Sequence, residues 1–166
     1  IYDWDKPFNY SAINNFGVKL ARGSIIALLN DDVEVINNGW LSEMVSHACR
    51  NEIGCVGAKL YYPNDTIQHA GVILGIGGVA GHSHKYFDSS SSGYFDRLQS
   101  CQQLSAVTAA CLLVKRELFE KVGGLITKVI KGLSKNPEDN SQIEEEVRKE
   151  VIDLCSSFPI YKNLNR

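Results

Sequence analysis

The residues best suited to chemistry in this sequence are three consecutive polar side chains, Asn30, Asp31 and Asp32, which directly follow a short apolar run. Carboxylate oxygens are ligands that Mg²⁺ and Mn²⁺ prefer, and these ions usually keep water and substrate phosphate oxygens as well. A cation held here would offset the negative charge that develops on a diphosphate leaving group. We therefore predict Asp32 as the metal ligand, with Asp31 or Asn30 contacting a ribose or a metal-bound water. The same three residues would also suit a simple Asx turn after a strand.

Helices and strands are predicted to alternate around this polar triplet. The apolar period of residues 8–20 predicts a helix that Asn9 or Ser11 caps. Residues 24–29 are almost wholly apolar and predict a strand buried on both faces. Residues 40–50 predict a second amphipathic helix. The alternation favours an α/β domain, in which ligands lie outside the carboxyl ends of strands, and the triplet follows such an end.

Shorter elements are predicted downstream. Residues 55–62 and 66–74 have strand character and are separated by a Pro-Asn-Asp turn. Residues 75–93 are rich in Gly and Ser and predict a long loop, of a kind that often carries function. A further strand is predicted at residues 104–115, and a short helix at residues 116–122 that a glycine pair ends.

Composition limits the partners that the chain can have. A formal net charge of −2 gives no basic surface for nucleic acid or an anionic membrane. The longest apolar run is far too short to span a bilayer, so we expect at most peripheral membrane contact. Five scattered cysteines without a C-x-x-C pair favour a reducing compartment, so we expect a cytoplasmic protein that at most docks on the inner face of the membrane. The chain opens without Met inside a motif-like stretch, and we interpret it as a fragment.

Two other patterns carry less weight. His82-Ser83-His84 offers two imidazoles, but no third ligand stands at a suitable spacing, so the pattern favours a loop lining a groove over a zinc site. Cys101 and Cys111 are predicted to be buried small hydrophobes, because no base lies beside either of them in the sequence.

The motifs of residues 1–125 resemble family 2 glycosyltransferases of the GT-A fold, and most closely the rhamnosyltransferase-like group that builds cell-surface polysaccharide. The resemblance covers about three quarters of the chain, and the motifs occur in the family's order. The matching segments are FNYSAINNFGVKLARG at 8–23, IALLNDDVEV at 26–35, GWL at 39–41, GAKLY at 57–61, IQHAGVILG at 67–75, AGHSH at 80–84, AVTAACLLVKR at 106–116 and GGL at 123–125.

This resemblance implies a partial GT-A three-layer sandwich, truncated at its N-terminus. It also implies a nucleotide-diphosphate sugar as donor, a divalent cation (Mg²⁺ or Mn²⁺), and a saccharide or lipid-linked glycan as acceptor. The triplet occupies the position of the family's D-x-D-like motif, although an Asn stands where the first Asp is commoner. The resemblance assigns residues to two sides: Asn15, Asn30, Asp31 and Asp32 to the donor, with Asp32 on the metal, and His69, Gly71, Thr108 and Ala109 to the acceptor.

The resemblance also predicts what this chain lacks. The family's catalytic base is a carboxylate shortly after Leu125, and no clear substitute follows here. Inverting transfer needs such a base to deprotonate the acceptor hydroxyl. We therefore expect little or no transferase activity from this polypeptide by itself.

Residues 126–166 are predicted to be a helical tail of different origin. The stretch from Val147 to Tyr161 resembles the extreme C-terminus of serine hydroxymethyltransferase, whose pyridoxal-phosphate lysine lies far upstream and has no counterpart here. We interpret the chain as a chimera joined near Leu125. Two alternative functions stay open: a serine hydroxymethyltransferase role suggested by the tail, and a non-catalytic carbohydrate- or nucleotide-binding remnant.

Overall fold

The computed structural model describes residues 1–75, 80–104, 106–125 and Lys149. The chain forms two compact units, one of residues 1–22 with 116–166 and the other of residues 23–115. The helices predicted within residues 126–166 lie outside the described residues, except for Lys149, which is helical. None of the helices in the described ranges has the length and apolar character that crossing a membrane requires.

In the first unit, helix α1 (Tyr10–Leu20) begins where the sequence predicted. The side chain of Asn9 accepts a hydrogen bond from the backbone N–H of Ala12 at 2.9 Å and so caps the helix. At the other end, the guanidinium of Arg116 donates to the carbonyls of Val18 and Ala21 at 2.9 and 2.8 Å. A cation on these last carbonyls satisfies groups that the helix itself leaves unpaired.

Helix α3 (Arg116–Lys121) also belongs to this unit, and it ends just before the predicted glycine pair. Gly123 and Gly124 have φ angles of +80° and +79°, which glycine adopts without strain. Just beyond them, the side-chain amide of Asn15 both donates to the carbonyl of Leu125 at 2.9 Å and accepts from its N–H at 2.8 Å. This double hydrogen bond fixes the chain after α3 against α1.

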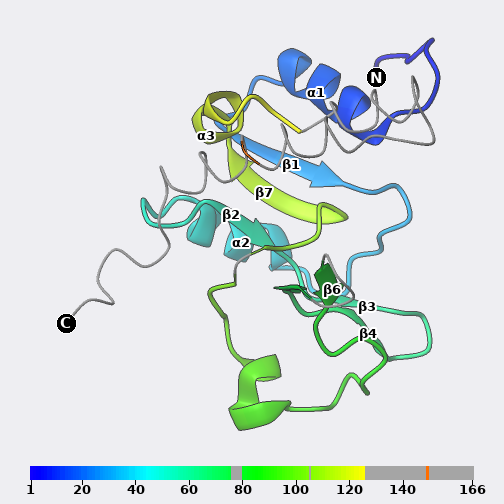
Figure 1. Ribbon diagram of the computed structural model, residues 1–166, viewed down its shortest axis with the longest axis vertical. Helices are drawn as coiled ribbons and strands as arrows, with labels where there is room; N and C mark the ends of the chain where they lie inside the picture. Colours follow the sequence, from blue (N-terminus) through cyan, green and yellow to red (C-terminus); the bar gives the residue numbers. More distant parts are fainter. Residues whose placement is uncertain (76–79, 105, 126–148, 150–166) are drawn as a thin grey trace. The chain divides into compact units, whose positions relative to one another are not determined.

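In the second unit, a three-stranded sheet has the order β1-β7-β2, with β7 between the other two (Figure 1). The strands are β1 (Ile25–Leu29), β2 (Cys55–Gly57) and β7 (Cys111–Lys115). β7 runs antiparallel to both neighbours, and Leu29 pairs with Cys111 while Gly57 pairs with Leu112. The carboxyl ends of β1 and β2 therefore lie at one edge of the sheet, where β7 begins.

The core of this unit lies between the sheet and helix α2 (Trp40–Ala48). Met44 and Ala48, one helical turn apart, pack in a buried cluster with Cys111 and Leu113 of β7. The predicted helix is thus confirmed. The buried position of Cys111 agrees with its predicted role as a small hydrophobe.

Two further pairs of short strands lie between β2 and β7 in the chain. β3 (Leu60–Tyr61) pairs with β4 (Ile67–His69), and β5 (Val72–Leu74) pairs with β6 (Ala80–His82), both antiparallel. A 3₁₀ segment, η2 (Tyr94–Gln99), comes next in the chain. The architecture is therefore α/β, with mixed helices and small sheets.

Several strand boundaries differ from those that the sequence predicted. The strand expected at residues 66–74 is split at Gly71, whose φ of +106° turns the chain between β4 and β5. The strand expected at residues 55–62 is likewise split into β2 and β3. Part of the loop predicted at residues 75–93 is strand β6, because it finds a partner in β5 that apolar periodicity alone does not reveal.

Strand β7 begins at Cys111, later than the predicted residue 104, because the chain before it turns through Thr108 and Ala110. β1 also differs from the prediction of burial on both faces. Ile26 and Leu28 are buried, but Ala27 and Leu29 on the other face are exposed. An apolar run thus identifies a strand without fixing how many of its faces are covered.

Candidate functional site

The polar triplet lies in a turn at the carboxyl end of β1. The backbone N–H of Asn30 donates to the carbonyl of Ala110 at 2.9 Å, which continues the β1–β7 ladder by one more bond. The side chains of Asp31 and Asp32 are exposed, and neither residue belongs to a helix. An exposed turn with two carboxylates and one amide is a hard-oxygen donor set that suits Mg²⁺ or Mn²⁺ when phosphate and water complete the shell.

His69, at the end of β4, is the most enclosed polar residue of this region. Its side chain is only 1% exposed. Its Nε2 accepts hydrogen bonds from the N–H groups of Gly71 and Thr108, both at 3.3 Å. Because Nε2 accepts, the neutral ring carries its proton on Nδ1 and donates it to Nδ1 of His82, 2.8 Å away.

The electrostatic state of His69 follows from this enclosure. Burial, with a smaller contribution from the nearby His82, lowers the pKa of His69 from its usual 6.5 to about 4. At neutral pH the ring is therefore uncharged and acts as a fixed junction. It connects β4, the turn at Gly71 and the segment at Thr108 that leads into β7.

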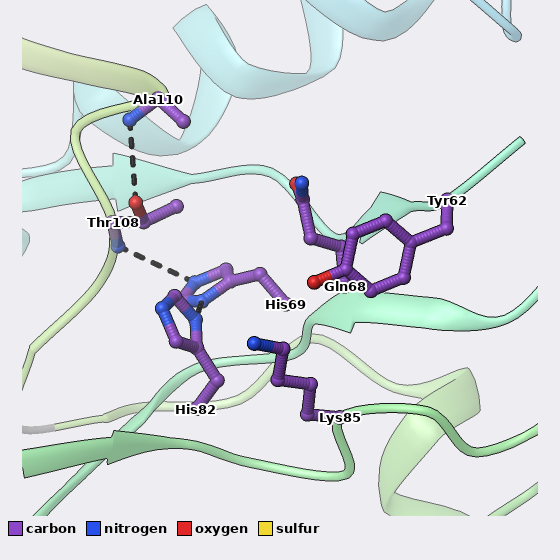
Figure 2. Close-up of a pocket in the computed structure, with 7 residues that line it drawn as sticks. All are labelled: Tyr62, Gln68, His69, His82, Lys85, Thr108 and Ala110. Carbon is purple, nitrogen blue, oxygen red and sulfur yellow. Dashed lines mark hydrogen bonds between the residues drawn. The ribbon is translucent and has the colours of Figure 1, made fainter.

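A polar pocket opens beside this histidine pair, with a volume of ≈ 200 Å³. Figure 2 shows the two imidazoles together on one side and the Tyr62 ring on the other, with Lys85 reaching between them. The pocket is lined by Tyr62, Gln68, His69, His82, Lys85, Thr108 and Ala110. Its volume is below the range typical of pockets that hold drug-sized ligands, so the pocket suits one small polar group or one unit of a larger ligand.

Lys85 gives the pocket a positive charge. Hydrogen bonds raise the pKa of Lys85, and the one with Tyr86 contributes more than the one with Tyr62. The rings of Tyr62 and Tyr86 stack with centroids 5.5 Å apart, so Tyr62 presents an ordered aromatic wall. A cation, an aromatic face, an amide and a hydroxyl are groups that bind hydroxylated or anionic ligands.

The structure brings some of the predicted site residues together. His69 and Thr108 line the pocket, and the N–H of Gly71 donates a hydrogen bond to His69. Ala109 lies between the lining residues Thr108 and Ala110. The polar triplet meets this group through Ala110, which lines the pocket and accepts the hydrogen bond from Asn30. Within the second unit, the triplet and the predicted acceptor residues thus both adjoin the segment that leads into β7.

Asn15 belongs to the first unit, and its amide is engaged by Leu125. Its predicted donor role stays a prediction. Sequence reasoning missed Tyr62, Gln68 and Lys85 as pocket residues. No short motif contains the three, because Tyr62 follows β3, Gln68 lies within β4 and Lys85 follows β6.

The family assignment rests on sequence comparison. Residues 2–123 match the family model described as glycosyl transferase family 2. The chain belongs to glycosyl transferase family 2. This membership agrees with the resemblance drawn from the motifs and with the α/β architecture of the described residues.

Similar proteins cover different parts of this chain. It is 62% identical over 120 residues to the uncharacterized protein y4gI of Sinorhizobium fredii, covering 72% of this chain and 13% of that protein. It is 45% identical over 122 residues to the O-antigen biosynthesis protein RfbC of Myxococcus xanthus, covering 73% of this chain and 10% of that protein. The chain therefore spans about a tenth of the length of these relatives.

A separate segment of 46 residues is 83% identical to serine hydroxymethyltransferase of Pelagibacter ubique, covering 28% of this chain and 11% of that protein. The pairing of a family 2 segment with a serine hydroxymethyltransferase segment is consistent with the predicted chimera. No solved structure matches the chain.

Proposed function

We propose that residues 1–125 are part of a glycosyltransferase that transfers a sugar from a nucleotide-diphosphate donor to a saccharide or lipid-linked glycan. The observation that carries the proposal is the hydrogen bond from Asn30 to Ala110. It joins the carboxylate turn to a residue of the polar pocket, so donor phosphates at the turn and an acceptor in the pocket would meet at one sheet edge. The similarity to RfbC, an O-antigen biosynthesis protein, supports a polysaccharide as the product.

In this proposal, Asp32 holds a divalent cation, with Asp31 or Asn30 on the ribose or a metal-bound water. The cation supplies charge neutralisation for the diphosphate leaving group. The exposure of both carboxylates leaves room for the phosphate and water ligands that Mg²⁺ and Mn²⁺ retain. Asn15 would lie on the donor side, as the family resemblance implies.

The acceptor would enter the pocket beside His69 and His82. Lys85 would attract an anionic group such as a lipid-linked phosphate, and the Tyr62 ring would support a sugar face. Neutral His69 would hold the Gly71 turn and Thr108 in place instead of exchanging protons. We propose little transfer by this chain itself, because the family's base is expected shortly after Leu125 and the sequence there offers no clear substitute. We also propose a cytoplasmic location for the protein.

Calorimetry of the full chain with a nucleoside diphosphate, with and without Mn²⁺, tests the donor site. We expect binding that requires Mn²⁺ and that weakens at least tenfold, or about 1.4 kcal/mol, in Asp32→Asn. The physical reason is that the amide removes the charge that holds the cation while keeping the size of the side chain.

Glu52→Gln is the matched control, because it removes one exposed negative charge from the turn before β2, at the opposite end of the sheet. It should bind like the unaltered chain. Equal weakening in both variants would mean that the loss of any negative charge weakens binding, and that Asp32 has no specific role in holding the cation. Binding that ignores both Mn²⁺ and Asp32→Asn would favour a non-catalytic remnant and contradict the proposal.

A further inference from the structure

A cluster of three potential metal ligands shares no residue with the carboxylate turn or the pocket. It consists of Glu43 and His47 on α2 and Cys101 in the segment after η2. One ligand atom from each residue lies within 4.8 Å of the other two. Within the described ranges, these are the three His, Cys, Asp or Glu side chains that lie close enough together to hold one metal ion.

Two of the ligands are placed by the helix itself. Glu43 and His47 are four residues apart, so their side chains lie on the same face of α2, one turn above the other. Each precedes a core residue, since Met44 and Ala48 point into the buried cluster. The core contacts therefore fix the rotation of α2 and present Glu43 and His47 beside its buried face.

The third ligand is held by a hydrogen-bonded turn. Arg97 Nε donates to Oε1 of Gln102 at 3.0 Å, and the amide of Gln102 donates back to the carbonyl of Arg97, so Cys101 lies inside a closed turn. Lys59 donates to the carbonyl of Leu98 at 3.0 Å and fixes this turn to the chain between β2 and β3. Cys101 is exposed and reduced, which corrects the prediction that it is a buried hydrophobe.

The spacing of the ligand atoms fits a particular ion. Sγ of Cys101 and Nε2 of His47 are 3.6 Å apart. In a tetrahedral zinc site with Zn–S of about 2.3 Å and Zn–N of about 2.0–2.1 Å, those two atoms are separated by about 3.6 Å. A sulfur, a nitrogen and an oxygen form a donor set for Zn²⁺, whereas Mg²⁺ and Mn²⁺ prefer oxygen alone.

We propose that Glu43, His47 and Cys101 bind one Zn²⁺ ion, with water as the fourth ligand. The ion would connect α2 to the segment that runs from Cys101 toward the pocket, where Leu104 packs over Gly71. Zinc binds the thiolate form of a cysteine, so binding displaces the thiol proton of Cys101 to solvent. The role is structural, and it is independent of the proposed cation at Asp32.

The test is titration of the full reduced, metal-free chain with Co²⁺, which reports a bound thiolate through a charge-transfer band in the near ultraviolet. We expect the band to saturate at one equivalent and to be abolished by one equivalent of Zn²⁺. Cys101→Ser should remove the band, and His47→Gln should weaken Co²⁺ binding at least about tenfold, the scale on which even outer-shell substitutions act.

Cys49→Ser is the matched control, because Cys49 is an exposed free cysteine at the end of the same helix. It should keep the band, and so should Asp32→Asn, which separates this site from the proposed donor site. Metal-free Cys101→Ser should unfold at the same temperature as the metal-free parent. A band that survives Cys101→Ser, a band lost equally in Cys49→Ser, or no band at all would each overturn the proposal and leave a plain thiol–imidazole hydrogen bond.

Discussion

The hydrogen bonds that hold the His69 ring in place matter as much as its acid–base properties. It is a buried imidazole with three polar contacts, to the backbone of Gly71, to the backbone of Thr108 and to the ring of His82. Both ring nitrogens are therefore used while the ring is neutral. A proton on Nε2 would break two hydrogen bonds at once and place a charge in a buried site.

We expect the stability of the chain to fall as the pH is lowered from about 6.5 to about 4. The pKa of His69 is about 4 in the folded protein, against a usual value of 6.5, so the unfolded state binds more protons across this window. The pKa difference sets an upper limit of about 3 kcal/mol on the loss. Urea unfolding at pH 7 and pH 4.5 measures it.

His69→Asn should lower stability at pH 7 and lose much of the additional decline on acidification. His84→Asn is the control, because it removes a different histidine and keeps the buried one. An unchanged acid dependence in His69→Asn would show that other groups cause the decline.

At the scale of elements, the site depends on where strands stop. β1 ends before Asn30, β4 ends at His69, and β7 starts only after Ala110. The bonds from Asn30 to Ala110 and from Thr108 to His69 cross between these ends. The irregular segment before β7 therefore brings the carboxylate turn and the histidine pair to one edge.

Gly71 is the turn that this arrangement requires, and we expect Gly71→Ala to cost at least about 2 kcal/mol of stability. Its φ is +106°, which strains any side chain, and an added Cβ would lie 2.3 Å from Cδ1 of Leu104. Chemical denaturation of the single and double variants measures the cost. Because Leu104→Ala removes the clash but leaves the strained backbone, Gly71→Ala should cost less in that background. An equal cost in both backgrounds would exclude the Leu104 contact as a cause.

At the scale of the whole molecule, the chain combines sequence from two families. Residues 2–123 match glycosyl transferase family 2, and a separate segment matches serine hydroxymethyltransferases. The second match spans 11% of the Pelagibacter enzyme. We propose a boundary near Leu125, where the glycine pair ends α3 and Asn15 holds the following backbone.

We expect the full chain to form no stoichiometric Schiff base with pyridoxal phosphate at a specific lysine. The enzyme's cofactor lysine has no counterpart in the tail, and a short segment of one enzyme supplies no enclosed cofactor site. Absorbance spectra of the chain mixed with the cofactor, before and after borohydride reduction, measure this. A reducible band that occurs in stoichiometric amount would instead support the serine hydroxymethyltransferase alternative.

The local features were predictable from sequence because short-range physics fixes them. Asn9 caps α1, the glycine pair ends α3, the apolar run before Asn30 forms a strand, and the carboxylates of Asp31 and Asp32 follow it in an exposed turn. Each of these depends on neighbouring residues, on helical or strand periodicity, or on the φ angles that glycine allows. The family motifs added the expectation that this turn and the region of His69 serve one site.

Only the tertiary structure decided which distant residues meet. The insertion of β7 between β1 and β2 placed Ala110 beside Asn30, and the turn after η2 placed Cys101 beside His47. No short window of sequence contains either pair, because the partners are separated by 80 and 54 positions. The contact between Asn30 and Ala110 follows from the order and register of the sheet, because a register slip of one residue would turn the side chains of the slipped strand to the opposite face.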